Sequence, residues 1–439
     1  MMIRRGFSSP LLRRNVLGCA PTIDSGSYSP PPISRLGLRS KRNITGHCCS
    51  RGFANNDVTQ RRHFSSDKNG SEDETAPFDH SVKLKQRTRA ADSCRKYYNH
   101  YLQSQSNTTQ QQDATKKPIL PYDYLHKEVA QRLAERLDDI CVRDEGFPLA
   151  LEVGAGAEFL HDAIIDGCDD DLMLESDDDD NAENVGGRGG IRKLVQIDSC
   201  SAMLHRDDVF AEEIKAKDEK NSTVCETFKL VANLDENPLP FPDGTFDLVI
   251  SSMAFHWVND LPRLLSEIER VLKPDGCLLF ALPGGNTLPE LRSSIVLSEL
   301  ERAGGVSTHV GPYIGLSNIG SLLTGTGFQL PTIDVDDIRI GYPNAFVLME
   351  HLDRMGEGNA SMNRRDRVGL GTFVGAACVY RELYPAEEGN HSEGIVASAQ
   401  IMYGIAWKEH ESQQKPKDRG SATVNMTDIS VTKTSANDK

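Results

Sequence analysis

The chain has 439 residues, which at about 150 residues per domain allows two or three domains. It carries 49 basic and 64 acidic side chains, for a net charge of −15. Such an acidic protein repels phosphate backbones, which argues against general nucleic-acid binding. No run approaches the roughly 20 consecutive apolar residues of a membrane-spanning helix. The sequence therefore predicts no integral membrane protein and leaves peripheral attachment open.

The cysteines indicate a reducing compartment. There are ten of them, and none forms a C-x-x-C pair. Their scatter argues against both a disulfide framework and a structural zinc site. The sequence therefore predicts no metal site from its cysteines.

Residues 1–64 differ in composition from the rest of the chain. They hold ten arginines and Lys41 but only two acids, Asp24 and Asp57. An Arg-rich, Ser-rich and acid-poor start is typical of an organelle transit peptide. The prediction is a mitochondrial transit peptide; a disordered basic tail and a plastid address are the alternatives.

Two polar stretches interrupt the remainder. Residues 65–119 are predicted to be a linker and low-complexity segment, with a Gln/Asn/Thr-rich run over 103–117. Residues 168–190 are rich in Asp and Glu with flanking glycines, which predicts a solvated loop. Calcium binding by this tract is an alternative, although the order of an EF-hand loop is lacking.

Residues 120–283 predict an α/β core. Leu125, Val129, Leu133 and Leu137 recur at amphipathic-helix spacing. Five apolar runs then alternate with helical patterns, ending or centred at 147–151, 193–198, 228–232, 246–250 and 277–281. Strands that alternate with helices predict a doubly wound parallel sheet. Residues 284–410 are predicted to form a helical lid or partner region, mostly helical over 284–385, with a late strand at 395–407. Residues 411–439 are a polar tail, either a partner contact or a solvated end.

A glycine turn follows the first predicted strand. Glu152, Gly154 and Gly156 lie where the chain leaves the carboxyl end of that strand. Glycines there permit a sharp turn and a close backbone approach to a ligand, next to a helix N-terminus with free N–H groups. The alternative is a tight turn without a ligand.

Asp198 ends the second predicted strand. An acid at this place in a nucleotide-binding sheet accepts both ribose hydroxyls. The acidic loop accounts for its unusually long separation from Gly156. A helix N-cap is the alternative role.

The run PLPFPDGTFDLVISSMAFHWVNDLPRLLSEIERVLKPDGCLLF, residues 238–280, resembles the core of class I S-adenosylmethionine-dependent methyltransferases. That resemblance implies a Rossmann-like, seven-stranded sheet whose last strand is antiparallel, with a helical insertion.

Six separated motifs, one of them inside this run, resemble one particular family with this fold, a mitochondrial assembly factor of respiratory complex I (NADH:ubiquinone oxidoreductase). They are FDHSVKLKQRTRAA, SSMAFHWVNDLPRLL, LPGGNTLPELRSS, ERAGGVSTHVGPY, EHLDRMGEGNA and WKEHESQQKPKDRGSATV. The resemblance covers about residues 78–429. It implies a hydroxylase of an arginine in a matrix-side iron–sulfur subunit, working beside other assembly factors. It also implies a matrix location, peripheral on the inner membrane.

The resemblance implies S-adenosyl-L-methionine as cofactor and carries over seven binding residues: Glu152, Gly154, Gly156, Asp198, Asn233, Leu234 and Asp235. One position departs from the family motif, because Glu158 stands where a glycine is usual. A carboxylate there either crowds the methionine end of the cofactor and repels its carboxylate, or points away and pairs with the sulfonium or amino group.

His256 and Trp257 follow the fourth predicted strand and are the catalytic candidates. The histidine can act as acid or base; the alternative is that both side chains pack. Two H-x-D pairs, His205 with Asp207 and His351 with Asp353, share residue types with non-haem iron sites. In a helical pattern such spacing points to different faces, so neither is predicted as a metal site.

Three functions remain open from the sequence. The leading prediction is an arginine hydroxylase that supports complex I assembly. The second is an S-adenosylmethionine-dependent methyltransferase acting on a protein or a small acid. The third is a non-catalytic assembly chaperone.

Overall fold

The computed structural model describes residues 76–106, 120, 122–140, 146–166, 187–208, 225–235, 238–365, 367–386, 394–413 and 420–421. The predicted transit peptide (1–64), most of the Gln-rich and acidic tracts and most of the polar tail lie outside these residues. No described helix is long and apolar enough to cross a bilayer.

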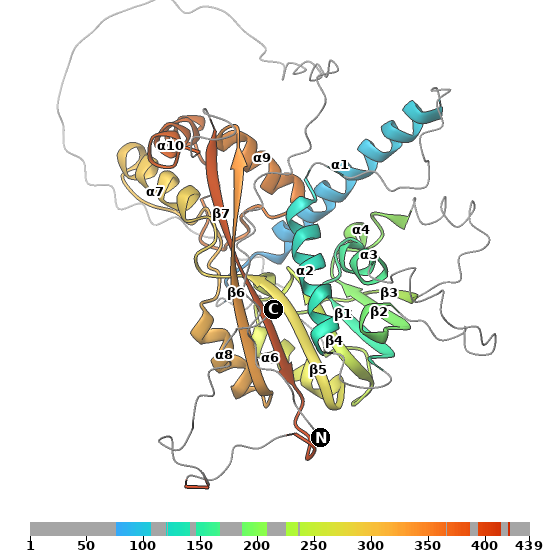
Figure 1. Cartoon of the computed structure of the whole chain (residues 1–439). Helices are drawn as coiled ribbons and strands as arrows, with labels where there is room; N and C mark the ends of the chain where they lie inside the picture. The colour runs from blue at the N-terminus through green and yellow to red at the C-terminus, as the bar shows by residue number, and fades with distance from the viewer. Residues whose placement is uncertain are drawn as a thin grey trace, which may run out of the picture. The chain divides into compact units, whose positions relative to one another are not determined.

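A seven-stranded sheet forms the centre of the fold (Figure 1), in the order β3-β2-β1-β4-β5-β7-β6. Its first five strands run parallel, and β7 is antiparallel to both of its neighbours. The bounds are β1 Leu149–Val153, β2 Lys193–Asp198, β3 Glu226–Val231, β4 Phe246–Ser252, β5 Leu272–Pro283, β6 Gln329–Tyr342 and β7 Ile395–Trp407. The predicted doubly wound, seven-stranded sheet with an antiparallel closing strand is confirmed.

Helices cover both faces of the sheet. Leu248 and Ile250 of β4 belong to one apolar cluster, and Val249 between them belongs to another, because successive strand residues point to opposite faces. The first face is covered by α2 (Tyr124–Ile140) and α3 (Phe159–Ile165). The second is covered by α6 (Leu261–Val271) and α8 (Leu316–Gly325). Shorter elements are η3 (Arg188–Gly190), α4 (Ser201–Leu204) and η4 (Phe255–Trp257).

The region after β5 is not only helical. It contains α7 (Pro289–Ala303), α8, α9 (Ala345–Met355) and α10 (Leu370–Leu383), as expected, but β6 occupies 14 residues within the stretch predicted as mostly helical. β6 lies at the edge of the sheet, and most of its side chains are exposed. Because exposed positions tolerate acids, its sequence lacks the regular alternation of apolar and polar residues that predicts a strand. Its backbone pairs only with β7, and that pairing is decided by tertiary structure.

The segment predicted as a linker is corrected as well. Residues His80–Ser106, inside the range 65–119, form helix α1. The sequence of α1 has a weak apolar pattern, but Ala90, Ala91 and Cys94 are buried. Arg87 of α1 reaches the buried carboxylate of Asp198 at the carboxyl end of β2, and this places the first turns of α1 against the sheet.

Candidate functional site

The loop after β1 makes two left-handed turns. Gly154 has φ 73° and Gly156 has φ 60°, a region that side chains rarely adopt. A Cβ on Gly154 would lie 2.2 Å from the Cβ of Ala254, so the loop approaches the end of β4 too closely for any side chain. The N–H of Gly156 donates to Asp198 Oδ2 at 2.8 Å. The glycines therefore bring the loop onto the acid that ends β2.

Asp198 is fully buried, and a cation covers it. Arg87 of α1 donates to both carboxylate oxygens, at 2.7 and 2.8 Å. The backbone N–H of Cys200 donates to Oδ1 at 2.7 Å. With Gly156, four donors surround the carboxylate that the sequence assigned to ribose hydroxyls. This acid does not face the cavity in this state of α1.

Asp235 lies in the loop after β3 and lines the cavity. His80 of α1 contacts its Oδ2, and Asn259 N–H donates to Oδ1 at 2.8 Å. Burial alone would raise the pKa of Asp235, but the His80 contact and the backbone N–H groups of Asn259 and Asp260 together hold that pKa below its usual value. Asn233 and Leu234, the other two predicted adenine contacts, line the same cavity.

Glu357, just after α9, is the third carboxylate and the centre of a cluster. Its Oε2 accepts from Trp257 Nε1 at 2.9 Å and lies 3.1 Å from His256 Nε2. His126 of α2 lies 3.6 Å from Oε1. Burial alone would raise the pKa of Glu357, but Lys83 and the two histidines hold it well below its usual value. A charged carboxylate is therefore fixed in place by donors from separate elements.

Lys83 of α1 is the cation of this cluster. Its Nζ donates to Gly356 O at 2.6 Å and lies 3.9 Å from Glu357 Oε2. It also lies 3.1 Å from the centroid of the Trp257 ring, well within cation–π range. Burial lowers the pKa of Lys83 to about 7, Glu357 opposes that shift and Arg87 adds to it.

These contacts form one pattern. His80, Lys83 and Arg87 recur at helical spacing in the first turns of α1, and each meets a different acid of the pocket: Asp235, Glu357 and Asp198. We call these three residues the basic stripe of α1. The stripe balances the three carboxylates of the site.

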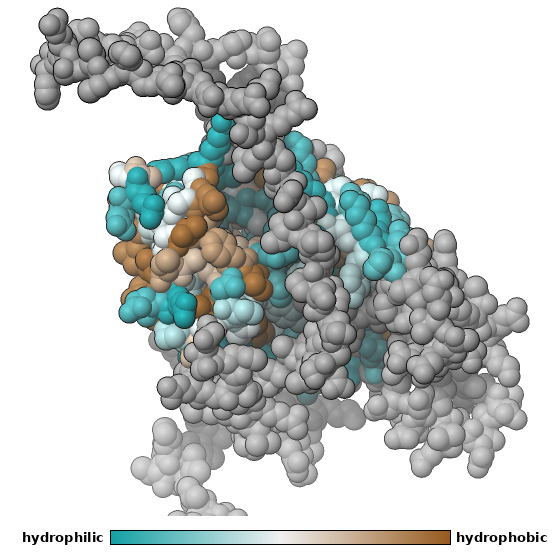
Figure 2. All heavy atoms as spheres, turned by 90° about the horizontal axis from the view of Figure 1, so that it is seen from above, coloured by the Kyte–Doolittle hydropathy of each residue, from teal (hydrophilic) through white to brown (hydrophobic). Residues whose placement is uncertain are grey.

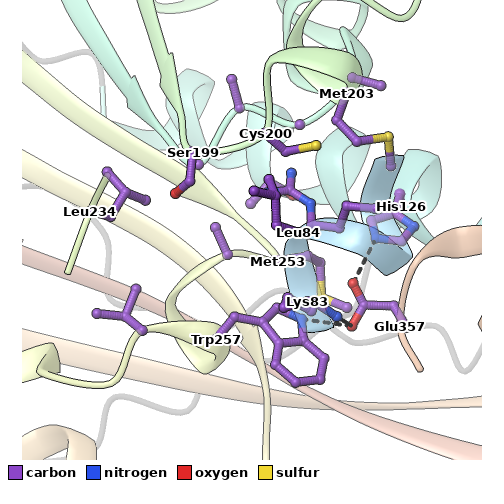
Figure 3. Close-up of a pocket in the computed structure, with 18 of the residues that line it drawn as sticks. Lys83, Leu84, His126, Ser199, Cys200, Met203, Leu234, Met253, Trp257 and Glu357 are labelled. Atoms are coloured by element: carbon purple, nitrogen blue, oxygen red, sulfur yellow. Dashed lines mark hydrogen bonds and ion pairs between the residues drawn. The ribbon is translucent and has the colours of Figure 1, made fainter. Parts of the chain in front are cut away.

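A cavity of about 320 Å³ remains between the stripe and the strand ends, at the lower end of the range of small-molecule sites. It is lined by six of the seven predicted cofactor residues; Asp198 is the exception, because Arg87 covers it. Figure 3 shows Glu357 between Lys83, Trp257 and His126 on one side of this cavity, and Cys200 and Met203 on the other. The cavity thus has a charged corner around Glu357 and Lys83, and a side lined by the sulfur-containing side chains of Cys200 and Met203.

The two catalytic candidates differ in position. Trp257 lines the cavity, whereas the His256 ring lies behind it, against Tyr313. Burial lowers the pKa of His256, so the neutral ring donates from Nε2 to the charged Glu357. Its buried Nδ1 has no hydrogen-bond partner among the described residues. His256 therefore lies where it holds Glu357 in place, and Trp257 lies on the wall of the cavity.

Glu152 is buried on the floor of the site. Gln196 Nε2 donates to its Oε2 at 2.8 Å. Burial, with a smaller effect of the nearby Asp198, raises the pKa of Glu152 to about 8, against the opposing effect of the Gln196 hydrogen bond. The Glu152 side chain therefore holds its proton at neutral pH, which limits the negative charge next to Asp198.

Glu158 does not line the cavity. Lys229 of β3 donates to its Oε1 at 2.8 Å, so this carboxylate turns toward β3. Glu158 thus points away from the cavity, and its partner is Lys229.

The H-x-D pairs are engaged elsewhere. His205 contacts Asp208 at 2.7 Å, while Asp207 is held by the buried Arg206. His351 lies among the rings of Tyr122, Tyr124 and Tyr342. Neither pair brings its two side chains to a common point.

Comparison with known proteins identifies the relatives of this chain. A family model described as a methyltransferase domain matches residues 182–280. The mitochondrial arginine-hydroxylase NDUFAF5 of Rattus norvegicus is 42% identical over 312 residues, 71% of this chain and 78% of that protein. Its Homo sapiens counterpart is 40% identical over 308 residues, 70% and 76% of the two chains.

The chain belongs to the arginine-hydroxylase NDUFAF5 family. The family predicted from the sequence motifs is thus confirmed. The malonyl-[acyl-carrier protein] O-methyltransferase of Halorhodospira halophila is similar at 26% identity over 306 residues, 70% and 88% of the two chains. A solved structure, the YcgJ protein of Bacillus subtilis, covers 64% of this chain and 99% of that one, with a TM-score of 0.40 and 15% identity.

Sequence reasoning missed half of the site of this NDUFAF5-family chain. The basic stripe, His126 and Glu357 were not predicted as site residues. Two of the motifs that resembled the family, FDHSVKLKQRTRAA and EHLDRMGEGNA, contain the stripe and Glu357. The helical spacing of His80, Lys83 and Arg87 was the available signal, but nothing local indicates which acids they meet.

Proposed function

We propose that this protein is a mitochondrial hydroxylase that modifies an arginine of an iron–sulfur subunit of complex I and so supports assembly of that complex. Identity with named arginine hydroxylases extends over 312 residues, far beyond the 182–280 segment of the methyltransferase model. The observation that carries the proposal is a set of three carboxylates at the pocket, Asp198, Asp235 and Glu357, each paired with a cationic side chain of α1. A positively charged ligand that took the place of these side chains would meet the same carboxylates.

A sulfonium cofactor of the S-adenosyl-L-methionine type fits this pocket. Asp198 now receives two parallel N–H donors from Arg87, and the two hydroxyls of a ribose are an equivalent pair of donors. Gly154 and Gly156 would hold the methionine end, and Asn233 to Asp235 the adenine. When bound, this cofactor supplies a positively charged sulfonium centre.

The residues of the chain contribute binding, orientation and exclusion of water. Trp257 and the Glu357 cluster form a dry, charged corner in which a cationic side chain is fixed relative to the rest of the cavity. Hydrogen bonds from Trp257 and His256 keep the Glu357 carboxylate in one orientation. Preorganised charge of this kind is what a reaction at a guanidinium-bearing side chain requires.

Methylation is the second candidate function. The methyltransferase domain match over 182–280 favours it, and the position of Glu158 removes one objection to it. Both reactions use the same pocket, so the product decides between them.

The proposed location is the mitochondrial matrix, with residues 1–64 as transit peptide and peripheral contact with the inner membrane. Figure 2 shows apolar side chains gathered on the face that carries α7 and α10. Leu300 of α7 is 52% exposed and Leu370 of α10 is 74% exposed. Exposed apolar residues of this size mark surfaces for lipid or protein contact.

Tandem mass spectrometry of the complex I iron–sulfur subunits tests the proposal. Cells lacking the protein would be compared with cells re-expressing the wild type, Glu357→Gln or, as a matched control, Glu350→Gln, an exposed glutamate of α9. We expect an arginine with one added oxygen in the wild type and in the control, and its loss in the Glu357→Gln cells.

Other product patterns would contradict the hydroxylase. An added methyl group in place of oxygen would establish the methyltransferase. No mass change at any site, together with failed assembly in the cells that lack the protein, would favour the chaperone.

A further inference from the structure

The groups around the Lys83 ammonium form a cation site with more interaction partners than this ammonium contacts directly. The site offers the indole face of Trp257, the carbonyl of Gly356 and the carboxylate of Glu357. The Lys83 Nζ lies 3.1 Å from the centroid of the Trp257 ring and 2.6 Å from the Gly356 carbonyl oxygen, but 3.9 Å from Glu357 Oε2. A single ammonium thus leaves the carboxylate without a direct hydrogen bond from its cation.

A guanidinium matches this set of groups better. It is planar and stacks on an aromatic ring, and its donors reach a carboxylate and a carbonyl together. Trp257 and His256 already fix Glu357 Oε2, so the carboxylate is held ready for a second partner. The arrangement of ring, carbonyl and carboxylate is therefore complementary to an arginine side chain.

We propose that Trp257, Glu357 and the Gly356 carbonyl form the subsite for the guanidinium of the substrate arginine, and that Lys83 is an internal occupant which the substrate displaces. This inference rests on the proposed function and deepens it, because it assigns the place where the substrate side chain binds.

The state of Lys83 makes displacement feasible. Burial lowers its pKa to about 7, so near neutral pH a fraction of the lysine is uncharged and attracts Glu357 weakly. An arginine keeps its charge throughout this range. Lys83 also lies in the first turn of α1, so a movement of the first two turns of the helix removes it from the corner.

Arg87 repeats this relationship one turn later. It covers Asp198 as Lys83 covers Glu357, and both belong to the same face of α1. Withdrawal of α1 by one ligand therefore exposes the carboxylate for the other. This couples the two subsites through a shared helix, with the same coupling energy seen from either ligand.

Binding of small arginine analogues to the full-length protein tests the subsite. The probe is N-acetyl-L-arginine methylamide, and its neutral isostere N-acetyl-L-citrulline methylamide is the control, both measured by isothermal titration calorimetry. We expect Lys83→Met to bind the arginine probe at least tenfold more tightly than the wild type. Lys83→Arg places a stronger occupant in the corner and should weaken binding.

Adding Glu357→Gln to the Lys83→Met protein should reduce affinity for the arginine probe at least tenfold, with the citrulline probe weak throughout. If Lys83 had only a structural role, the Lys83→Met and Lys83→Arg substitutions would not change the affinity for the arginine probe in opposite directions. Circular dichroism confirms that each variant is folded, and Lys83→Arg, which keeps the charge, secures the test if Lys83→Met unfolds.

Equal binding of both probes by the wild type and both Lys83 variants would overturn the subsite. Failure of the subsite and failure of the proposed function give different results. Hydroxylated arginine in cells together with equal probe binding means that the substrate binds elsewhere. Probe binding that follows the variants, without any hydroxylated product, supports the subsite and rejects the hydroxylase.

Discussion

Arg87 of α1 donates two parallel hydrogen bonds to Asp198 at the end of β2, at 2.7 and 2.8 Å. The two residues are 111 positions apart in the chain. Their pairing brings α1 onto the strand ends and covers the acid that a ribose would otherwise meet. The same helix thus closes the pocket and neutralises it.

Replacing Arg87 by Met should strengthen cofactor binding and weaken the fold. The change leaves the buried Asp198 carboxylate unpaired, which costs about 3 kcal/mol in the free energy of unfolding. A ribose can then satisfy the acid without first displacing the arginine. Calorimetry with S-adenosylhomocysteine and thermal melting measure the two effects, with the exposed Arg89→Met as control. Weaker cofactor binding in Arg87→Met would instead show that Arg87 itself holds the ligand.

The two glycines of the loop should respond differently to alanine. Gly154→Ala brings a Cβ within 2.2 Å of Ala254 at a φ of 73°, so both a clash and strain destabilise it, by about 3 kcal/mol or more. Gly156→Ala meets only Arg87 Nη2, at 3.5 Å, and should cost about 1–2 kcal/mol for its left-handed backbone. Urea unfolding compares them. Equal losses would mean that the approach to Ala254 relaxes freely.

Glu152→Gln should remove a pH dependence of stability. The glutamate of the unfolded chain loses its proton near its ordinary pKa of 4.5, and that of the folded protein near a pKa of about 8. Between these values the native state holds the extra proton, so this residue lowers wild-type stability as the pH rises from 4.5 to 8. Glutamine cannot ionise, and its amide can donate to Gln196 Oε1, a buried atom with no partner among the described residues. Urea unfolding at pH 6 and pH 8 should show a smaller loss of stability in the variant; an unchanged loss would refute this assignment.

The affinity of the wild type for the arginine probe should rise with pH across the range in which Lys83 loses its charge, near pH 7. The titratable groups that face Glu357 are Lys83 and Arg87 from α1, His126 from α2, His256 from η4 and Tyr313 from the loop before α8. The Lys83→Met protein keeps the two histidines and isolates their contribution. Calorimetry from pH 6 to pH 8 should give a clear rise in the wild type and a flatter profile in the variant. Parallel profiles would attribute the effect to the histidines.

Leu370→Glu should reduce membrane binding without harm to the fold. The side chain is 74% exposed on α10, so the substitution should change stability by less than about 0.5 kcal/mol. Flotation with vesicles of phosphatidylcholine and cardiolipin measures the attachment. Leu316→Glu, on the exposed start of α8, is the matched control. Equal flotation of both variants and the wild type would reject this face as a membrane contact.

Elements with a strong local pattern were predictable. The spacing of Leu125, Val129 and Leu133 indicated α2, and all three are buried in the structure. The apolar runs of β1, β2, β4 and β5 indicated a parallel sheet because such strands are buried on both faces. The glycine turn and the acids at the strand ends followed from the same reasoning, since ligands in these sheets bind at the carboxyl ends of the strands.

Elements that depend on distant partners were not predictable. β6 exposes Leu330 and Val335 and carries acids on the sheet edge, so its pattern gave no strand period. Helix α1 lacks a continuous apolar face, and its first turns are fixed by ion pairs to acids far along the chain. Such pairs leave no periodic trace in the local sequence.

The amino-acid sequence by itself determined the five parallel strands β1 to β5, the glycine loop and the family of this protein, because strand burial and turn chemistry are local properties and the order of motifs is read along the chain. Only the tertiary structure decided what fills the pocket. Glu357 is 274 positions from Lys83, and it is the fold that brings the carboxylate, the lysine and the Trp257 ring into one buried corner. Buried charges must be paired, and the pairs of Lys83 with Glu357 and of Arg87 with Asp198 hold α1 over the site.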